Sequence, residues 1–156
     1  DILRDGRLDY DDDVRATFDY VIGSVHAGQR MEEAEMTRRI EAAVRNPRLD
    51  MLGHATGRLL LYREPYPLDI VRILDAAAET GAAVEINGDP RRMDLGWRWW
   101  PAAKDRGVAC AVNPDAHSVA GMGAVVYGIA MARKGWLEAE DVINTWELDQ
   151  VVAWLG

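Results

Sequence analysis

The residues best suited to chemistry in this sequence are its histidines and one aspartate. The chain has three histidines, His26, His54 and His117. Asp115 lies two residues before the last of them. Imidazole and carboxylate ligands without a thiolate suit zinc, manganese or iron. A metal ion held by these side chains can lower the pKa of bound water to about 7 and polarise a phosphoryl or carbonyl oxygen.

The elements that must position these residues are expected to be short strands alternating with helices. Apolar stretches bounded by turn residues predict strands at 18–25, 49–52, 82–86 and 108–112. Helical spacing predicts helices at 31–46, 67–80, 94–106, 124–134, 138–144 and 147–155. This alternation predicts an α/β fold with a parallel sheet, in which every strand delivers its carboxyl end to the same edge. Because each histidine follows a predicted strand closely, we expect the three to converge at that edge.

A single histidine after a strand is more often an ordinary hydrogen-bonding residue than a metal ligand, so the metal hypothesis depends on all three together. The alternative is a serine–histidine–carboxylate triad with Ser24 or Ser118 as the nucleophile. Neither serine lies in the Gly-x-Ser-x-Gly turn typical of such enzymes. No glycine-rich phosphate loop with a lysine is present either. The metal site is therefore the preferred interpretation.

Composition limits the class of protein. The 156 residues suffice for one domain, and 49% apolar with 28% charged residues indicates a globular chain. No apolar run approaches the roughly 20 residues of a membrane-spanning helix, so we expect no membrane association. The single cysteine, Cys110, excludes an internal disulfide and favours a cytoplasmic location. A net charge of −8 argues against a simple basic surface for phosphate backbones, but not against a phosphate substrate held by bound cations.

Three polar residues near strand ends are candidates for substrate binding. Arg58 and Arg92 can clamp phosphate oxygens through their planar guanidinium groups, although as isolated surface charges they would have no such role. Asn87 ends the third predicted strand and is preferred as a member of the site. Glu85 is expected to point away from the site or to pair locally.

A group of tryptophans precedes the fourth predicted strand. Trp97 and Trp100 have helical spacing, which indicates that they cover the sheet. Stacking of these rings and of Trp99 on nucleic-acid bases is the less favoured alternative.

Five motifs give the chain a family resemblance. They are Ser24-Val-His26, the Gly-His-Ala-Thr-Gly-Arg-Leu-Leu segment at 53–60, Glu85-Ile-Asn87, Asn-Pro-Asp-Ala-His-Ser at 113–118, and the segment 127–136. Together they resemble the polymerase and histidinol phosphatase (PHP) superfamily, in particular the PHP domain at the C-terminus of bacterial family X DNA polymerases. The resemblance runs over almost the whole chain.

The resemblance implies a distorted (β/α)7 TIM-like barrel with a trinuclear Mn2+ or Zn2+ centre at the carboxyl ends of its strands. Residues 1–156 would form a single partial PHP domain, the C-terminal part of that barrel with its N-terminal strands missing. The resemblance implies four metal ligands: His26, His54, Asp115 and His117. These residues would act in catalysis through a metal-activated water. The family's polar loop residues correspond to Arg58 and Arg92 as possible substrate contacts, and Asn87 joins them because of its position at a strand end.

Departures from the family pattern also carry expectations. The family's opening His-x-His, its next Asp-His pair and a bridging glutamate would all lie upstream of Asp1. Pro114 replaces a usual threonine or serine, and Gly88-Asp89 replaces a usual Ala-Asn, which adds a negative charge near the site. We therefore expect an open partial barrel with exposed sheet edges, weak metal binding and little or no activity of this chain alone.

The resemblance implies a metal-dependent hydrolase, and three roles are weighed for the chain, the last of them non-catalytic. The first is a phosphoesterase acting as a 3′-5′ exonuclease or processing DNA 3′ ends as part of a family X polymerase. The second is a histidinol-phosphatase-like phosphomonoesterase. The third is a non-catalytic structural module that contacts the polymerase core. Expected partners are DNA 3′ ends or another phosphoester, and the polymerase core or the missing N-terminal part of the barrel.

Overall fold

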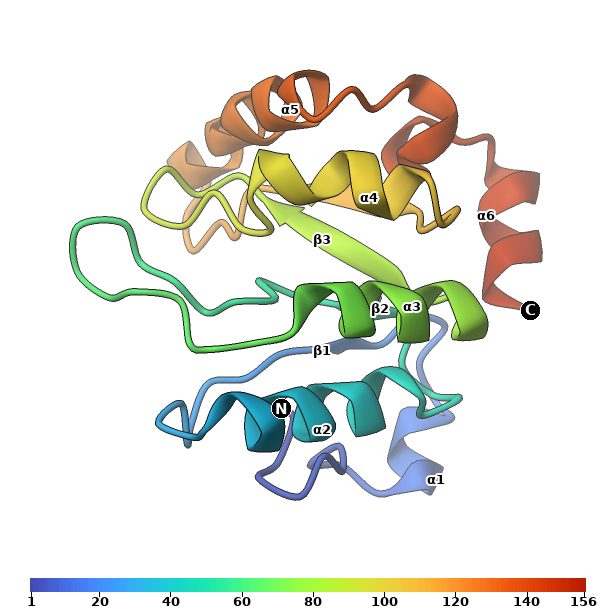
Figure 1. The fold of residues 1–156 in the computed structure, drawn as a ribbon. Helices are drawn as coiled ribbons and strands as arrows, with labels where there is room; N and C mark the ends of the chain where they lie inside the picture. Colours follow the sequence, from blue (N-terminus) through green and yellow to red (C-terminus); the bar gives the residue numbers. More distant parts are fainter.

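A parallel sheet of four strands organises the structure, a computed structural model that describes residues 1–156 (Figure 1). In spatial order, which is also chain order, the strands are β1 (Ile22–Gly23), β2 (Met51–Leu52), β3 (Ala83–Asn87) and β4 (Cys110–Asn113). All five residues of β3 are buried, which is typical of an inner parallel strand. The α/β class and the parallel sheet are confirmed. The strands form an open sheet, which agrees with part of a TIM-like barrel, while the barrel itself is not seen.

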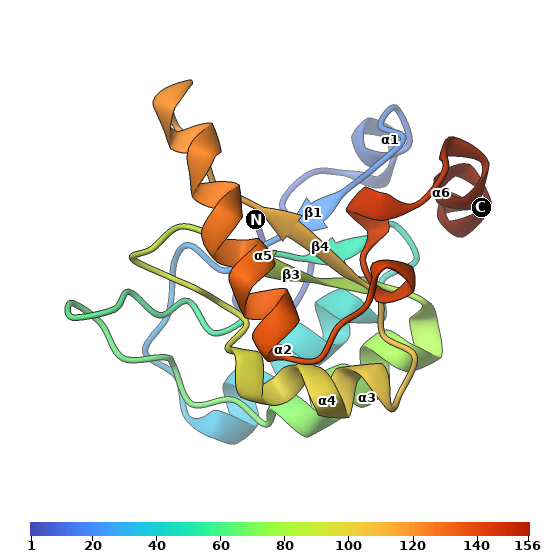
Figure 2. The same cartoon turned by 90° about the horizontal axis from the view of Figure 1, so that it is seen from above.

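Six helices surround this sheet. They are α1 (Asp12–Arg15), α2 (Glu33–Val44), α3 (Ile70–Thr80), α4 (Trp100–Lys104), α5 (Val125–Lys134) and α6 (Leu148–Leu155). Seen from above in Figure 2, α2, α3 and α4 lie together on one side of the sheet. Helix α5 packs against β3 and β4. No helix has both the length and the apolar character needed to span a bilayer.

Helix α3 illustrates how local sequence sets the limits of an element. A side-chain oxygen of Asp69 accepts the backbone N–H of Arg72 at 3.1 Å, which caps the N-terminus. At the other end Gly81 has φ 77°, a left-handed conformation that glycine adopts without steric cost. Between these caps Ile73 and Leu74 are buried, so the helical spacing read from the sequence is confirmed.

The main core lies between the sheet and these helices and contains 30 buried residues. Trp100 is fully buried and donates its Nε1–H to the backbone oxygen of Leu95 at 3.2 Å. The expectation that this ring covers the sheet is therefore confirmed. Gly128 brings α5 close to the sheet, because a Cβ added there would lie 2.5 Å from Cγ1 of Val112.

The opposite face of the sheet is only partly covered. It carries a small apolar cluster of Met51, Ala83 and Ala111, against which Tyr20, Ile143 and Trp154 pack. Trp154, in α6, also donates its Nε1–H to the backbone oxygen of Gly81 at 2.9 Å. Polar residues replace this apolar cluster toward the carboxyl ends of the strands.

The first predicted strand is shorter than expected. Regular pairing in the segment 18–25 is limited to β1. Phe18 and Ile22 are 61% and 46% exposed, so the segment lies at the margin of the sheet and β2 is its only strand partner. Aromatic and β-branched residues favour strands only where a neighbouring strand is available for pairing.

Two of the helices predicted from the sequence also differ from those in the structure. The helix expected at 94–106 begins with a 3-10 turn, Trp97–Trp99, and continues as α4. Asp94 is held out of the helix because it forms an antiparallel bridge with Asn87 at the end of β3. In place of the helix expected at 138–144 there are two 3-10 turns, at residues 139–141 and 143–145.

The outer edge of β4 is covered, contrary to the expectation of exposed sheet edges. The side-chain oxygen of Asn144 accepts the backbone N–H of Val112 at 2.7 Å, and its Nδ2 donates to the Val112 oxygen at 3.2 Å. Next to it, Val142 forms a parallel bridge with Cys110. The C-terminal segment thus satisfies backbone groups that a bare edge would leave unpaired.

Candidate metal centre

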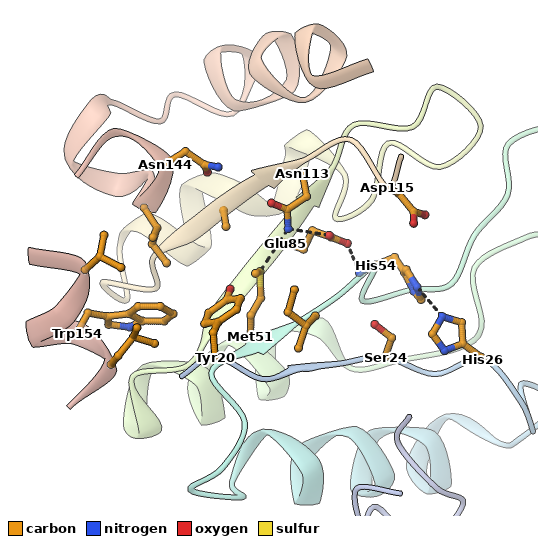
Figure 3. Close-up of a pocket in the computed structure, with 15 residues that line it drawn as sticks. Tyr20, Ser24, His26, Met51, His54, Glu85, Asn113, Asp115, Asn144 and Trp154 are labelled. Carbon is orange, nitrogen blue, oxygen red and sulfur yellow. Dashed lines mark hydrogen bonds between the residues drawn. The ribbon is translucent and has the colours of Figure 1, made fainter. Parts of the chain in front are cut away.

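Two imidazoles meet at the carboxyl edge of the sheet. His26 follows β1 and His54 follows β2, which are adjacent parallel strands. Their Nε2 atoms lie 3.2 Å apart, and their ring planes are inclined by 75° (Figure 3). Gly53 allows this approach, because a Cβ there would lie 2.5 Å from Oγ of Ser24.

Hydrogen bonds at the other ring nitrogen leave Nε2 of two histidines available as a ligand. Nδ1 of His26 contacts the carboxylate of Asp1, which only accepts, so Nδ1 carries the proton. Nδ1 of His117 donates to the backbone oxygen of Asp115 at 2.8 Å. In a neutral ring the Nε2 atom then carries the lone pair. Such partners typically orient histidines that bind metals.

Asp115 lies beside this pair but is engaged with an arginine. Arg92 donates its Nε–H to Oδ2 of Asp115 at 2.9 Å, and both side chains are largely buried. His117 is exposed and lies in a neighbouring hollow that shares Asp115. Ser118, one of the two serines considered as nucleophiles, accepts the backbone N–H of Gly121 at 3.2 Å. The strand ends therefore gather two imidazoles, one carboxylate and one guanidinium, with the third imidazole at the periphery.

His54 is the buried member of the pair, at 6% exposure. Burial, followed by the positive charge of Arg92 and the adjacent His26, lowers the pKa of His54 to about 4. The ring is therefore neutral at neutral pH and able to donate a lone pair to a cation. His54 has φ 29° and Asp115 has φ 54°, a left-handed region uncommon for residues with a side chain. Strained backbone of this kind occurs where a site fixes its side chains.

Glu85 anchors the site and is a residue that the sequence reasoning missed. Its Oε2 accepts the backbone N–H of His54 at 2.7 Å and Nδ2 of Asn87 at 3.2 Å. Its Oε1 accepts Nδ2 of Asn113 at 2.9 Å. Burial raises the pKa of Glu85, while these three donors oppose the rise. One carboxylate thus ties together the ends of β2, β3 and β4, contrary to the expectation that it points away or pairs only locally.

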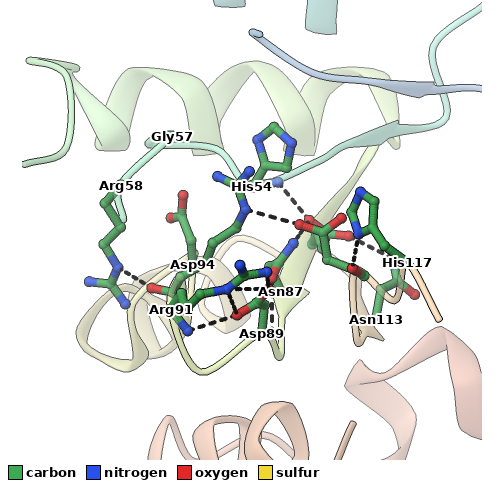
Figure 4. Close-up of polar contacts among 12 residues, drawn as sticks. His54, Gly57, Arg58, Asn87, Asp89, Arg91, Asp94, Asn113 and His117 are labelled. Atoms are coloured by element: carbon green, nitrogen blue, oxygen red, sulfur yellow. Dashed lines mark hydrogen bonds and ion pairs between the residues drawn. The ribbon is translucent and has the colours of Figure 1, made fainter. Parts of the chain in front are cut away.

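Two of the predicted substrate contacts, Asn87 and Arg58, do not line the pocket that contains the two imidazoles. Asn87 is fully buried, with its Oδ1 accepting the backbone N–H of Asp89 at 3.1 Å. Arg58 donates Nε–H to the backbone oxygen of Arg92 at 2.7 Å and also contacts the oxygen of Met93 (Figure 4). In this structure Asn87 and Arg58 therefore brace loops, and Arg92 is the candidate substrate contact that reaches the site.

A pocket of about 640 Å³ opens beside these residues on the partly covered face of the sheet (Figure 3). Its polar wall is formed by Ser24, His26, His54, Glu85, Asn113 and Asp115. Its apolar part includes Met51 and Trp154. The pocket is wide enough for a small phosphoester next to the two imidazoles.

The paired histidines fit two ligands of one divalent cation. Tetrahedral metal–nitrogen bonds of about 2.0–2.1 Å put two ligand atoms roughly 3.3 Å apart, close to the observed 3.2 Å between the Nε2 atoms. No group of three or more His, Cys, Asp or Glu side chains is arranged to hold an ion. The donor set of the chain is thus compatible with part of a coordination shell.

The known proteins to which the chain is similar have names that indicate phosphoester chemistry. The chain is 40% identical over 155 residues to the DNA polymerase/3′-5′ exonuclease PolX of Bacillus subtilis, covering 99% of this chain and 27% of that protein. It is 32% identical over 162 residues to a probable phosphatase of Caldanaerobacter subterraneus, covering 97% of this chain and 60% of that protein. No protein-family model matches the chain. The chain is similar over almost its whole length to these proteins, and its resemblance to the PHP domain of bacterial family X DNA polymerases is confirmed.

Proposed function

We propose that residues 1–156 form a single partial PHP domain of a metal-dependent phosphoesterase that acts on DNA 3′ ends, as a 3′-5′ exonuclease or 3′-end-processing unit, with little or no activity of this chain alone. The observation that carries the proposal is the 3.2 Å separation of the two Nε2 atoms of His26 and His54 at the carboxyl edge of the sheet. The 40% identity to PolX supports the DNA substrate. The whole polymerase, of which this chain spans about a quarter, is proposed as the setting of that activity.

The histidines and the aspartate have separate roles in this proposal. His26 and His54 would hold a divalent cation, Mn2+ or Zn2+, through Nε2, and Asp115 and His117 would supply further donors. The chemistry supplied at this place would be polarisation of a phosphoryl oxygen and a lowered pKa of bound water. His54 is suited to this role because its low pKa keeps the ring unprotonated. The Asp1 carboxylate keeps the proton of His26 on Nδ1.

Arg92 and Glu85 prepare the surroundings of the cation. Arg92 balances the charge of Asp115 and is the positive group beside the pocket, so it orients a phosphate. Glu85 fixes the backbone of His54 and thereby the position of its ring. This support is needed because a displacement of about 1 Å in such a site can cost two orders of magnitude in rate.

Hydrolysis of three substrates tests the proposed activity. The chain, joined to the missing N-terminal part of the barrel and to a polymerase core because little activity is expected of it alone, is incubated with Mn2+ or Zn2+ and one substrate. The substrates are p-nitrophenyl phosphate, bis-p-nitrophenyl phosphate and a 3′-labelled oligonucleotide. Activity on the two diesters alone supports the proposal, and activity on the monoester alone contradicts it. Absence of activity with all three, in the chain joined to a polymerase core, favours a non-catalytic module.

Metal binding by variants tests the site. We expect weak binding, because only two imidazoles converge; two or more tightly bound ions per chain after dialysis would contradict this expectation. His54→Asn should lower affinity for Mn2+ or Zn2+ at least tenfold, since asparagine accepts the positive φ but lacks the ring nitrogen. For Asp115→Asn, the matched control is Asp13→Asn in the exposed α1. Equal affinities of Asp115→Asn and its control would remove Asp115 from the site.

A phosphomonoesterase is the second candidate. It is favoured by the probable phosphatases, of which the one from Caldanaerobacter subterraneus is 32% identical and a Thermoanaerobacter relative 29% identical. A monoester carries one more negative charge than a diester, so it would depend more strongly on Arg92. Loss of monoester hydrolysis in Arg92→Ala, with diester hydrolysis reduced less, would favour this candidate.

A further inference from the structure

A second groove, separate from the histidine pocket, lies where loops from β2 and β3 meet α5. It has a volume of about 500 Å³. Its walls include Arg58, Leu60, Trp97, Arg98, Trp99 and Lys134. The 3-10 turn before α4 supplies the two tryptophans, and the last turn of α5 supplies the lysine (Figure 1).

The groove differs in charge from the rest of the molecule. Three of the ten residues that line it are cationic and none is acidic. The chain as a whole has 26 acidic and 18 basic residues. Arg98 and Lys134 are exposed, and neither takes part in an ion pair with a carboxylate. Their charges are therefore available to an anionic ligand.

Aromatic rings stand beside these cations. The Lys134 ammonium lies 4.6 Å and the Arg98 guanidinium 5.4 Å from the centroid of the Trp97 ring, so Trp97 holds both cations in place. Trp99 is 38% exposed and stacks on no other aromatic ring. An exposed indole next to fixed cations can bind the face of a nucleobase while the cations bind phosphate.

The loop that follows β3 connects the groove to the histidine pocket. Arg58 holds the loop that follows β3 through its contacts with the backbone oxygens of Arg92 and Met93. The side chain of Arg92 extends from this same loop to Asp115 beside the histidines. A ligand that crosses this loop could therefore contact both places.

We propose that this groove binds single-stranded nucleic acid, with a base stacked on Trp99 and the adjacent phosphates held by Arg98 and Lys134. The inference rests on the proposed function, since the bound strand would be the one whose 3′ end is hydrolysed. Binding in the groove itself needs no metal ion. An acidic protein segment would match the charges but would have no base to stack on the exposed indole.

Fluorescence anisotropy of a labelled oligothymidylate, measured in a chelator, tests the proposal. Lys134→Glu should weaken binding at least tenfold, whereas Arg48→Glu, which reverses an exposed charge in the turn after α2, should change it less than twofold. Trp99→Ala should weaken binding about fivefold or more, and Trp99→Phe should retain most of the affinity. His54→Asn should bind as the unmodified chain does, which separates groove binding from hydrolysis.

Three results would overturn the proposal. The first is no oligothymidylate binding at low salt, whether or not the chain hydrolyses phosphodiesters. The second is equal weakening by Lys134→Glu and Arg48→Glu, which would indicate a general charge effect. The third is displacement of the oligonucleotide by polyglutamate of equal charge at equal concentration, which would indicate an acidic protein ligand. Oligonucleotide binding without hydrolysis, in the chain joined to the rest of the barrel and a polymerase core, would uphold the groove and contradict the proposed function alone.

Discussion

Replacing Glu85 with leucine tests whether one buried carboxylate holds three strand ends together. The change leaves three donors without an acceptor: the backbone N–H of His54 and the Nδ2 groups of Asn87 and Asn113, now bound at 2.7, 3.2 and 2.9 Å. Each unsatisfied buried donor costs about 1–3 kcal/mol. Removing a buried carboxylate offsets part of this cost, because burial already disfavours its charged form. We expect the free energy of unfolding to fall by about 3 kcal/mol.

Glu85→Gln is the matched control for this experiment. Its single side-chain oxygen can still accept from His54 and Asn87, and the Asn113 amide can turn over to accept from the new NH2 group. The expected loss is about 1 kcal/mol. Urea unfolding followed by tryptophan fluorescence, in a chelator at pH 7, measures both variants. A leucine variant as stable as the unmodified chain, or a glutamine variant as unstable as leucine, would refute the anchoring role.

Three further predictions concern pH, packing and the core. Burial lowers the pKa of His54 from 6.5 to about 4, so the neutral ring's contribution to stability is complete above pH 6.5 and is lost as pH falls toward 4. Between these pH values, urea unfolding in a chelator should show that the unmodified chain loses up to about 3 kcal/mol more stability than His54→Asn does. Parallel stability–pH profiles of the two proteins would contradict this prediction. Gly128→Ala should lower the melting temperature, because a Cβ 2.5 Å from Cγ1 of Val112 costs about 1–3 kcal/mol against a helix-propensity gain of about 1 kcal/mol. The double variant Gly128→Ala, Val112→Ala should lose less stability than the two single variants lose together. Additive losses would exclude the clash. Trp100→Ala should reduce the free energy of unfolding by about 3–5 kcal/mol, with Trp100→Phe less affected, and calorimetry that finds the two variants equal would argue against the assigned core position.

The sequence predicted the sheet best where hydrophobic pattern and turn chemistry agreed. The four strands occur in the expected segments, and α3 ends at Thr80, the last residue of the helix predicted at 67–80. The meeting of His26 and His54 follows from the rule that parallel strands end at one edge. The limits of β1 could not be predicted in the same way, because pairing at the margin of a sheet depends on neighbours that are distant in sequence.

The Glu85 interpretation failed although a signal was available. In a strand, alternate residues share a face, and Val84 and Ile86 belong to the core under the helices. Glu85 must then point to the other face, toward the pocket, with Asn87 beside it. The position of Arg58 had no such signal, since it depends on how two loops pack and not on the period of an element.

The side-chain amide of Asn144 satisfies backbone hydrogen-bonding groups at the outer edge of β4. It imitates a peptide group of a further strand, donating and accepting at Val112 where a neighbouring chain would otherwise bind. Two copies of the molecule therefore cannot extend a common β-ladder across this side unless the turn around residue 144 first detaches. Protection against self-association along this edge thus depends on the C-terminal segment, through the Asn144 amide and the bridge of Val142 with Cys110, both remote in sequence from the strand that they shield.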